Sequence, residues 1–280
     1  MAFISQTLRS QVLSQEMHLD IYLPNDYGNK VSMTKPQGIL YFLHGFGRSG
    51  KYIKELTAIS RYARDNQLAV VFVDAPQGWY SDMYCGFNYL TYITEELPTL
   101  LENIYGLKFP REKTFLSGLS MGGYGTWKIG LSRPDLYGAI APLSAPSDFE
   151  TVIEMMKQVE DGTNILGFHS FFNAFGPDLQ LTEMDIPMKA LEKVSKLPAD
   201  QQPRIRVMCG KQDKVLDIYK QNVKLDQFAK TLPLADYKFW RWDGEHEEVF
   251  WDRAILHAIA FFLENDYDEK EIRKWRCERE

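Results

Sequence analysis

The most constraining feature of the sequence is a turn between an apolar segment and a glycine-rich one. Residues 113–117 read Lys-Thr-Phe-Leu-Ser, and residues 118–127 read Gly-Leu-Ser-Met-Gly-Gly-Tyr-Gly-Thr-Trp. When a strand reverses sharply into a helix, the residues two before and two after the turn press against the backbone, where glycine alone fits without steric cost. This G-x-S-x-G spacing predicts a strand, a sharp turn and a helix.

The predicted turn also gives Ser120 a chemical interpretation. It would raise the Ser120 hydroxyl above the edge of a sheet and leave the Met121 amide, at a helix N-terminus, facing any oxygen that becomes negative. The alternative is a glycine-rich loop in which Ser120 only caps a helix. The preceding strand and the partner residues found later in the chain favour Ser120 as a nucleophile.

The rest of the chain alternates between strand and helix patterns. Apolar or alternating segments of strand length occur at 3–10, 17–23, 38–43, 68–73, 114–117, 138–143, 204–209 and 237–242, and helical patterns at 52–65, 89–104, 124–131 and 249–263. The first two strands alternate as half-buried strands do, which predicts an antiparallel entry to the sheet. We therefore predict a single α/β domain over 1–280, with a mostly parallel central sheet flanked by helices on both faces.

Residues 147–200 interrupt this alternation. They combine mixed helical patterns, an aromatic cluster at 168–175 and charged segments. We interpret them as a cap-like insertion after the sixth strand, folded over the strand ends. The sequence leaves open whether this cap moves as a lid or simply shapes a pocket.

Bulk properties exclude several classes of function. The 280 residues carry a formal net charge of −6, and no basic cluster suited to nucleic acid occurs before the last dozen residues. No apolar stretch approaches a membrane span, and no leader precedes the first strand pattern. Cys85, Cys209 and Cys277 form no C-x-x-C pair, so neither a disulfide framework nor a thiolate metal site is expected. A cytoplasmic protein is predicted.

Two loops after strands are candidates for contacts with a ligand. The strand at 38–43 ends in His44-Gly45-Phe46-Gly47, and in this architecture such a loop donates the second amide to an oxyanion, here that of Phe46. His44 is interpreted as a brace for the loop. The strand at 68–73 leads to an aromatic loop in which Trp79 and Tyr80 either line a substrate pocket or cover the core.

An acid and a base follow the last two strands. Asp213 lies a few residues beyond the strand at 204–209, where a carboxylate can reach an imidazole, and Asp217 is its nearest competitor. His246 lies in the loop before the last helix, at the same sheet edge as Ser120. The chain order Ser120, Asp213, His246 is that of the α/β-hydrolase fold, which predicts acyl transfer without a metal or organic cofactor.

At these residues the sequence resembles a known family. Leu43-His44-Gly45, the run from Arg111 through Gly118-Leu119-Ser120-Met121-Gly122 to Gly125, Cys209-Gly210 with Asp213, and His246 with Phe250-Trp251 are similar to those of the esterase D-type esterases, and most of all to bacterial tributyrin and acetyl esterases. The resemblance extends over nearly the whole chain. It implies a serine carboxylesterase for short acyl esters, including acetylated carbohydrates, with Ser120, Asp213 and His246 as its triad and Phe46 and Met121 at its oxyanion site.

The expected partner is a small ester bound near Gly45, Trp79 and Tyr80, with no nucleic acid or membrane; a homo-oligomer is left open. S-formylglutathione hydrolases carry Ser-Gly-Leu-Thr-Cys where this chain has His44 to Gly47, which disfavours thioester activity but keeps an S-formylglutathione hydrolase as an alternative. The sequence also leaves open a feruloyl or acetylxylan esterase acting on oligosaccharides, an acyltransferase like the related mycolyltransferases, and a non-catalytic binding module.

Overall fold

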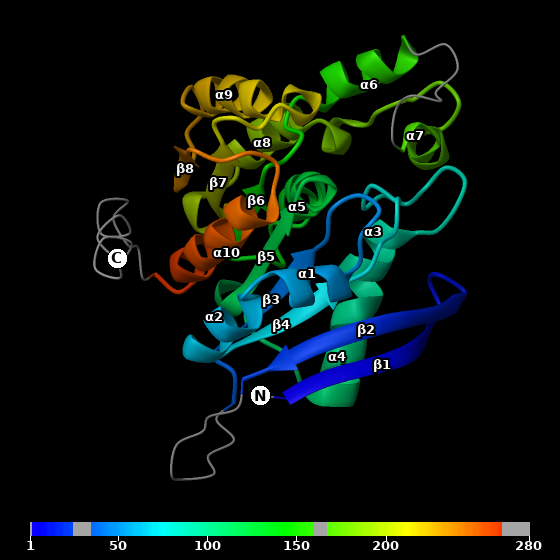
Figure 1. The fold of residues 1–280 in the computed structure, drawn as a ribbon, viewed down its shortest axis with the longest axis vertical. Coiled ribbons are helices and arrows are strands. Elements are labelled where there is room, and N and C mark those ends of the chain that lie inside the picture. Colours follow the sequence, from blue (N-terminus) through cyan, green and yellow to red (C-terminus); the bar gives the residue numbers. More distant parts are fainter. Residues whose placement is uncertain (1, 25–34, 159–166, 265–280) are drawn as a thin grey trace.

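An eight-stranded sheet runs through the computed structural model, which describes residues 2–24, 35–158 and 167–264 (Figure 1). The strand order is β1-β2-β4-β3-β5-β6-β7-β8; β1 and β2 are antiparallel to their neighbours, and β3 to β8 are parallel. The strands are β1 Ala2–Ser10, β2 Gln15–Leu23, β3 Gly38–Leu43, β4 Leu68–Val73, β5 Thr114–Leu119, β6 Ala139–Leu143, β7 Arg204–Gly210 and β8 Tyr237–Trp242. The predicted α/β class and the antiparallel entry are confirmed.

Helices cover both faces of this sheet. One face packs against α1 (Gly50–Leu56), α2 (Ile59–Asp65) and α10 (Glu248–Phe262), which lie in front of the sheet in Figure 1. The other packs against α3 (Tyr89–Thr91), η1 (Tyr92–Glu96), α4 (Leu97–Tyr105), α5 (Met121–Ser132), α8 (Pro187–Ser195) and α9 (Ile218–Ala229). Because β3 and β4 are buried on both sides, their sequences read as continuous apolar runs rather than alternating ones.

The predicted helix over 52–65 is wrong, because the structure breaks it into α1 and α2. Thr57 adopts an extended conformation, and its hydroxyl donates a hydrogen bond to the Ile53 carbonyl at 2.7 Å. The Ala58 N–H donates to the Asp252 carboxylate of α10 at 2.6 Å. The break is therefore fixed by a residue nearly two hundred positions away, which local periodicity does not show.

The helix predicted over 89–104 is irregular just before Pro98. Residues Tyr92–Glu96 form a π-helical turn, in which the Leu97 N–H bonds the Tyr92 carbonyl. Proline has no N–H and its ring displaces the preceding turn, and a π-turn is one way for a helix to absorb this. α4 then ends at Gly106, whose left-handed conformation closes the helix.

The stretch predicted as an insertion lies between β6 and β7 and contains α6 (Phe149–Lys157), α7 (Phe168–Phe175), η3 (Glu183–Asp185) and α8, of which α8 packs against α5 and α9. Aromatic rings attach the insertion to α5 and to the loop after β4: Tyr124 of α5 stacks on Phe149 at 3.9 Å, and Trp79 of the loop packs on Phe171 at 4.3 Å between ring centroids. The buried Lys128 ammonium pairs with Asp185 of η3. Residues 159–166 of the predicted cap lie outside the described residues.

None of the helices in the described ranges is long and apolar enough to cross a bilayer. Cys85 is exposed and Cys209 is buried, while Cys277 and the charged segment 265–280 lie outside the described residues.

Candidate active site

The turn between β5 and α5 holds Ser120 in a strained conformation. Its φ of 56° and ψ of −118° place a non-glycine residue in a region that costs on the order of 1–3 kcal/mol. The Ser120 N–H donates to the Leu143 carbonyl at 2.9 Å, which ties the turn to β6. A Cβ at Gly122 would come within 2.1 Å of the Leu43 carbonyl oxygen, and one at Gly118 within 2.5 Å of the Gly122 carbonyl oxygen. Both glycines of the motif are therefore sterically required.

The structure brings Ser120, Asp213 and His246 together. His246 Nε2 lies 2.9 Å from Ser120 Oγ, and His246 Nδ1 lies 2.8 Å from Asp213 Oδ2. Because an ionised carboxylate only accepts, Nδ1–H donates to Asp213 and Nε2 is left to accept the serine proton. Asp213 is buried, with 2% of its surface exposed, whereas Asp217 points elsewhere and pairs with Lys220 at 2.9 Å.

The residues predicted to bind the oxyanion, Phe46 and Met121, line the same cavity as Ser120. Met121 is the first residue of α5, so its N–H has no acceptor within the helix. Gly45, which precedes Phe46, lines this cavity as well. His44 is buried behind them: its Nδ1–H donates to the Gly45 carbonyl at 2.7 Å, and its Nε2 accepts the Ala75 N–H at 3.0 Å. Burial lowers the pKa of His44, so the ring stays neutral and braces the loop, as the sequence pattern predicts.

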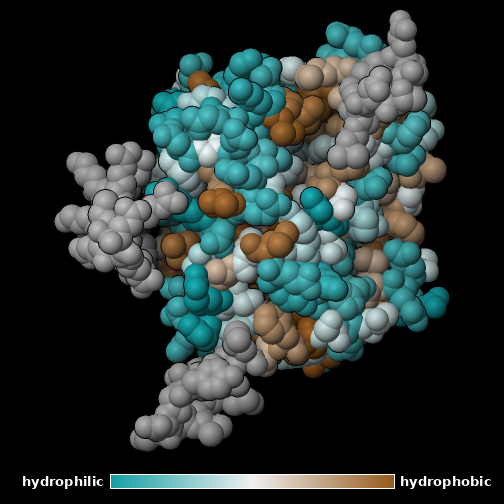
Figure 2. Space-filling view, in the orientation of Figure 1, coloured by the Kyte–Doolittle hydropathy of each residue, from teal (hydrophilic) through white to brown (hydrophobic). Residues whose placement is uncertain are grey.

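A cavity of about 530 Å³ opens beside Ser120 and His246. Figure 2 shows hydrophobic side chains exposed between α6 and α9, at the cap side of this region. Trp79 lines the cavity and its Nε1–H donates to Ser170 of α7 at 2.8 Å. Tyr80, predicted with it as a substrate contact, is fully buried and donates its hydroxyl to the His44 carbonyl at 2.8 Å. Both residues have positive φ.

Much of the cavity wall was not predicted from the sequence. The apolar lining includes side chains of α6, α7 and the segment before α9, namely Met155, Met156, Phe171, Val215, Leu216 and Ile218. Arg48, Tyr52 and Glu248 form a polar part of the wall. Of these three polar residues, only Glu248 could have been suggested by the sequence, because it stands two residues after His246.

The remaining histidines and the buried thiol are not part of this site. His18 contacts Ser5 and Asp20, His169 is exposed, and His257 is buried between Trp240 and Trp242. Burial raises the pKa of the Cys209 thiol, so it is no nucleophile at neutral pH. Within the described residues, no group of three or more His, Cys, Asp or Glu side chains is arranged to hold a metal ion.

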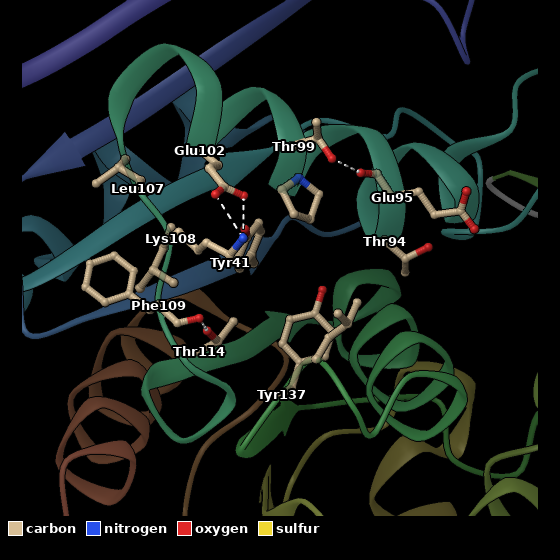
Figure 3. Close-up of a pocket in the computed structure, with 13 residues that line it drawn as sticks. Tyr41, Thr94, Glu95, Thr99, Glu102, Leu107, Lys108, Phe109, Thr114 and Tyr137 are labelled. Atoms are coloured by element: carbon tan, nitrogen blue, oxygen red, sulfur yellow. Dashed lines mark hydrogen bonds and ion pairs between the residues drawn. The ribbon is translucent and has the colours of Figure 1, made fainter.

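A second hollow, of about 290 Å³, lies at the other end of the parallel strands, where β3 and β5 begin (Figure 3). Tyr41, Glu102, Lys108 and Tyr137 are among its lining residues, and no serine, cysteine or histidine is. Among the residues that line this hollow there is therefore no nucleophile and base of the kind that hydrolysis needs.

The sequence matches a known family over most of its length. A family model described as "Putative esterase" matches residues 10–262. The chain belongs to this esterase family. An acetyl esterase of Caldicellulosiruptor saccharolyticus is 25% identical over 93% of this chain and 98% of its own length.

Two solved structures from Staphylococcus aureus are also similar. The fluorophosphonate-binding serine hydrolase FphF is 28% identical with a TM-score of 0.77, covering 93% of this chain and 98% of that one. The S-formylglutathione hydrolase FrmB is 29% identical with a TM-score of 0.76, over the same shares of the two chains. The chain is thus a carboxylic-ester hydrolase with an α/β-hydrolase fold.

Proposed function

We propose that this esterase hydrolyses short-chain acyl esters, from acetyl to butyryl and including tributyrin, through an acyl-enzyme on Ser120. The observation that carries the proposal is the continuous hydrogen-bond chain from Ser120 Oγ through His246 to Asp213. A free serine is a weak nucleophile, and this chain supplies the base that activates it.

In the proposed mechanism, Ser120 Oγ attacks the ester carbonyl as His246 Nε2 takes its proton. Asp213 holds the imidazole tautomer and stabilises the imidazolium. The amides of Phe46 and Met121 bind the oxyanion, each contributing on the order of 3 kcal/mol. The intermediate expels the alcohol, to which His246 returns the proton. Water, deprotonated by His246, then attacks the acyl-enzyme and releases the carboxylic acid and free Ser120.

The cavity supports a short apolar acyl group. Methionine and aromatic side chains from α6 and α7 cover the space above Ser120 and exclude water from an alkyl chain. The proposed partner is accordingly a small-molecule ester rather than a macromolecule, and we propose a cytoplasmic location.

The proposal is tested by pre-steady-state kinetics with p-nitrophenyl butyrate. A burst of nitrophenol equal to the enzyme concentration is expected, because nitrophenol leaves readily and acylation of Ser120 then outpaces hydrolysis of the acyl-enzyme. His246→Gln should lose turnover, because it removes the general base. The matched control is His169→Gln, which changes an exposed histidine of the cap. A fluorophosphonate should label Ser120; failure to label the folded protein would favour a non-catalytic binding module.

Thioester hydrolysis is the second candidate, supported by the 29% identity to FrmB. The loop at His44 to Gly47 is the sequence difference that argues against it. Comparing kcat/KM for S-formylglutathione and for p-nitrophenyl butyrate decides between them, and the addition of acceptor alcohols to the same assay tests acyl transfer. A higher kcat/KM for S-formylglutathione would show that the thioester, and not the short-chain ester, is the preferred substrate.

A further inference from the structure

Tyr80 links the loop after β4 to the loop after β3. Its side chain is fully buried and is not among the described residues that line the cavity beside Ser120. The hydroxyl donates a hydrogen bond to the His44 carbonyl at 2.8 Å. Burial, together with the charge of Asp74, raises the pKa of Tyr80 well above its ordinary value, so the hydroxyl stays protonated and continues to donate. Tyr80 therefore contacts the loop that carries the predicted oxyanion donor, and not the cavity itself.

The ring of Tyr80 packs against α5 at Gly125. A Cβ at Gly125 would lie 2.4 Å from Cδ2 of the ring and 2.5 Å from Cγ, well inside the separation of about 3.5–4.0 Å at which carbon atoms pack. Tyr80 also has a φ of 52°, a backbone conformation that residues other than glycine seldom adopt. The glycine that follows Ser120 by five positions thus makes room for the ring that reaches His44.

His44 is held at its ring as well as at its carbonyl. Nδ1 lies 2.7 Å from the Gly45 carbonyl oxygen, and Nε2 lies 3.0 Å from the Ala75 nitrogen. A carbonyl only accepts and a backbone N–H only donates, so these partners require the neutral ring with its proton on Nδ1. Together with the bond from Tyr80, these contacts fix both the carbonyl and the imidazole of one residue.

The bond from the imidazole to Gly45 orients the next amide along the chain. The Gly45 carbonyl and the Phe46 N–H belong to one planar peptide, and in a trans peptide the C=O and N–H bonds point in opposite directions. Because this carbonyl points at the buried ring of His44, the Phe46 N–H points away from that ring. Phe46 lines the cavity that contains Ser120, and its N–H thus has the orientation expected of an oxyanion donor.

We propose that Tyr80 is a positioning residue, which holds His44 so that the imidazole aims the Phe46 N–H at the oxyanion, and that Gly125 provides the seat for Tyr80. This inference rests on the proposed ester hydrolysis and adds residues that touch neither the substrate nor Ser120. An oxyanion donor stabilises the transition state only at hydrogen-bond distance from the oxygen. A small shift of the loop should therefore lower the rate without weakening substrate binding.

The test compares Tyr80→Phe with the wild type in the hydrolysis of p-nitrophenyl butyrate. The nitrophenol burst first gives the concentration of active sites in each sample, so a partly unfolded sample is not mistaken for a slow enzyme. Acylation and hydrolysis of the acyl-enzyme both pass through an oxyanion, so kcat and kcat/KM should fall by the same factor of about ten, with KM unchanged. Loss of a residue that binds the substrate would instead raise KM.

Propyl trifluoromethyl ketone provides a second measurement that depends on the oxyanion. Ser120 Oγ adds to the carbonyl carbon as His246 takes the proton, and the carbonyl oxygen becomes an oxyanion that no leaving group relieves. The inhibition constant for Tyr80→Phe should rise by about the factor by which kcat/KM falls, because the inhibitor and the transition state use the same donors. A change that only loosened the fold would lower the melting temperature without coupling these two quantities.

Gly125→Ala acts on the same loop without removing a hydroxyl. The added methyl group displaces the Tyr80 ring, so parallel changes in kcat/KM and in the inhibition constant are expected. The double variant should lose little more than either single variant, because the two residues act through the same contact. Two controls match these changes. Gly130→Ala adds a methyl group on the same helix against Ile140 of β6, and Tyr137→Phe removes a buried hydroxyl at the other end of the strands; both should keep the wild-type kcat and inhibition constant.

A folded Tyr80→Phe variant whose kcat/KM stays within about two-fold of wild type overturns the proposal. So does a rise in KM at unchanged kcat, a lower kcat/KM at an unchanged inhibition constant, or an equal loss in Gly130→Ala. If Tyr80→Phe does not fold, the same outcomes are read from Gly125→Ala. Absence of both burst and turnover in the folded wild-type protein rejects the proposed hydrolysis itself, which is a distinguishable result.

Discussion

The two hollows at opposite ends of the parallel strands are both lined by polar and aromatic side chains. They differ in how these polar groups and the backbone around them are arranged. Beside Ser120 the polar groups are linked in hydrogen-bonded chains, and several lining residues, Trp79, Ser120 and Leu216, have positive φ. In the second hollow no lining residue has positive φ, and the buried Tyr137 hydroxyl has no hydrogen-bond partner in the described part of the chain (Figure 3). A concave shape is therefore a weaker sign of catalysis than linked polar groups held by a strained backbone.

The largest expected contrast is in the reaction itself. Ser120→Ala removes the nucleophile and should lower kcat by about a million-fold, measured with p-nitrophenyl butyrate. Thr99→Ala removes a hydroxyl from the second hollow and should leave kcat unchanged. Substantial turnover by folded Ser120→Ala would show that catalysis does not depend on the nucleophile in the hollow beside Ser120.

The next contrast concerns the carboxylate. Asp213→Asn keeps the shape of the side chain but no longer fixes the imidazole tautomer, so kcat should fall by about 10⁴-fold. Asp217→Asn, at an exposed residue close by in sequence, is the matched control. Equal effects of the two changes on kcat would show that the carboxylate beside His246 is not the one that matters.

Ion pairs offer a contrast in stability. Lys128 lies beneath the cap with 6% of its surface exposed, and Lys128→Met would leave Asp185 as a buried charge without its partner, costing about 3–5 kcal/mol. At the second hollow, Lys108 pairs with Glu102 in solvent, and Lys108→Met should cost about 0–1 kcal/mol. Urea unfolding of both variants measures the difference. Similar losses would mean that the cap is not anchored by this pair.

The pH dependence of the free energy of unfolding should show the contribution of the buried His44 imidazole. Burial lowers its pKa below the ordinary 6.5, so the unfolded chain binds the proton more readily. The free energy of unfolding therefore decreases as pH falls below 6.5, by up to about 1.4 kcal/mol per pH unit from this group, until the pKa of the folded state is reached. His44→Gln should show a shallower slope between pH 7.5 and 5.5 than wild type, and His169→Gln the wild-type slope. Identical slopes in all three proteins would contradict this origin.

The smallest expected effect is that of Tyr137→Phe. It removes a buried hydroxyl that has no partner in the described part of the chain, so the free energy of unfolding should stay constant or rise by up to about 1 kcal/mol. Differential scanning calorimetry is sensitive enough to decide. Destabilisation by more than this would indicate that the hydroxyl has a role in the second hollow.

Much of the fold was predictable because its signals are local. Strands buried on both faces have apolar sequences, and Gly118 and Gly122 mark the turn at Ser120 because no other residue fits there. The chain order of Ser120, Asp213 and His246 then indicated which residues could meet. That inference was possible because the loops that follow parallel strands meet at the same end of the sheet.

The features that escaped prediction depend on distant contacts. The break between α1 and α2 is set by Asp252, the polar cavity wall by the pairing of Tyr52 with Glu248, and the cap anchor by Lys128 with Asp185. No periodicity in the sequence links such partners. The sequence left open whether Trp79 and Tyr80 line a pocket or cover the core, because their positive φ values are not marked by glycine.

The docking of α10 has a consequence for the timing of activity. This helix closes the face over α2 through Asp252, and the loop before it delivers the imidazole to a serine made far earlier in the chain. A growing polypeptide on the ribosome therefore carries its alcohol nucleophile in an unactivated form while most of the sheet is already synthesised. Activation of Ser120 therefore waits until His246 has been synthesised and α10 has docked, and esters do not acylate the serine of the unfinished protein efficiently before then.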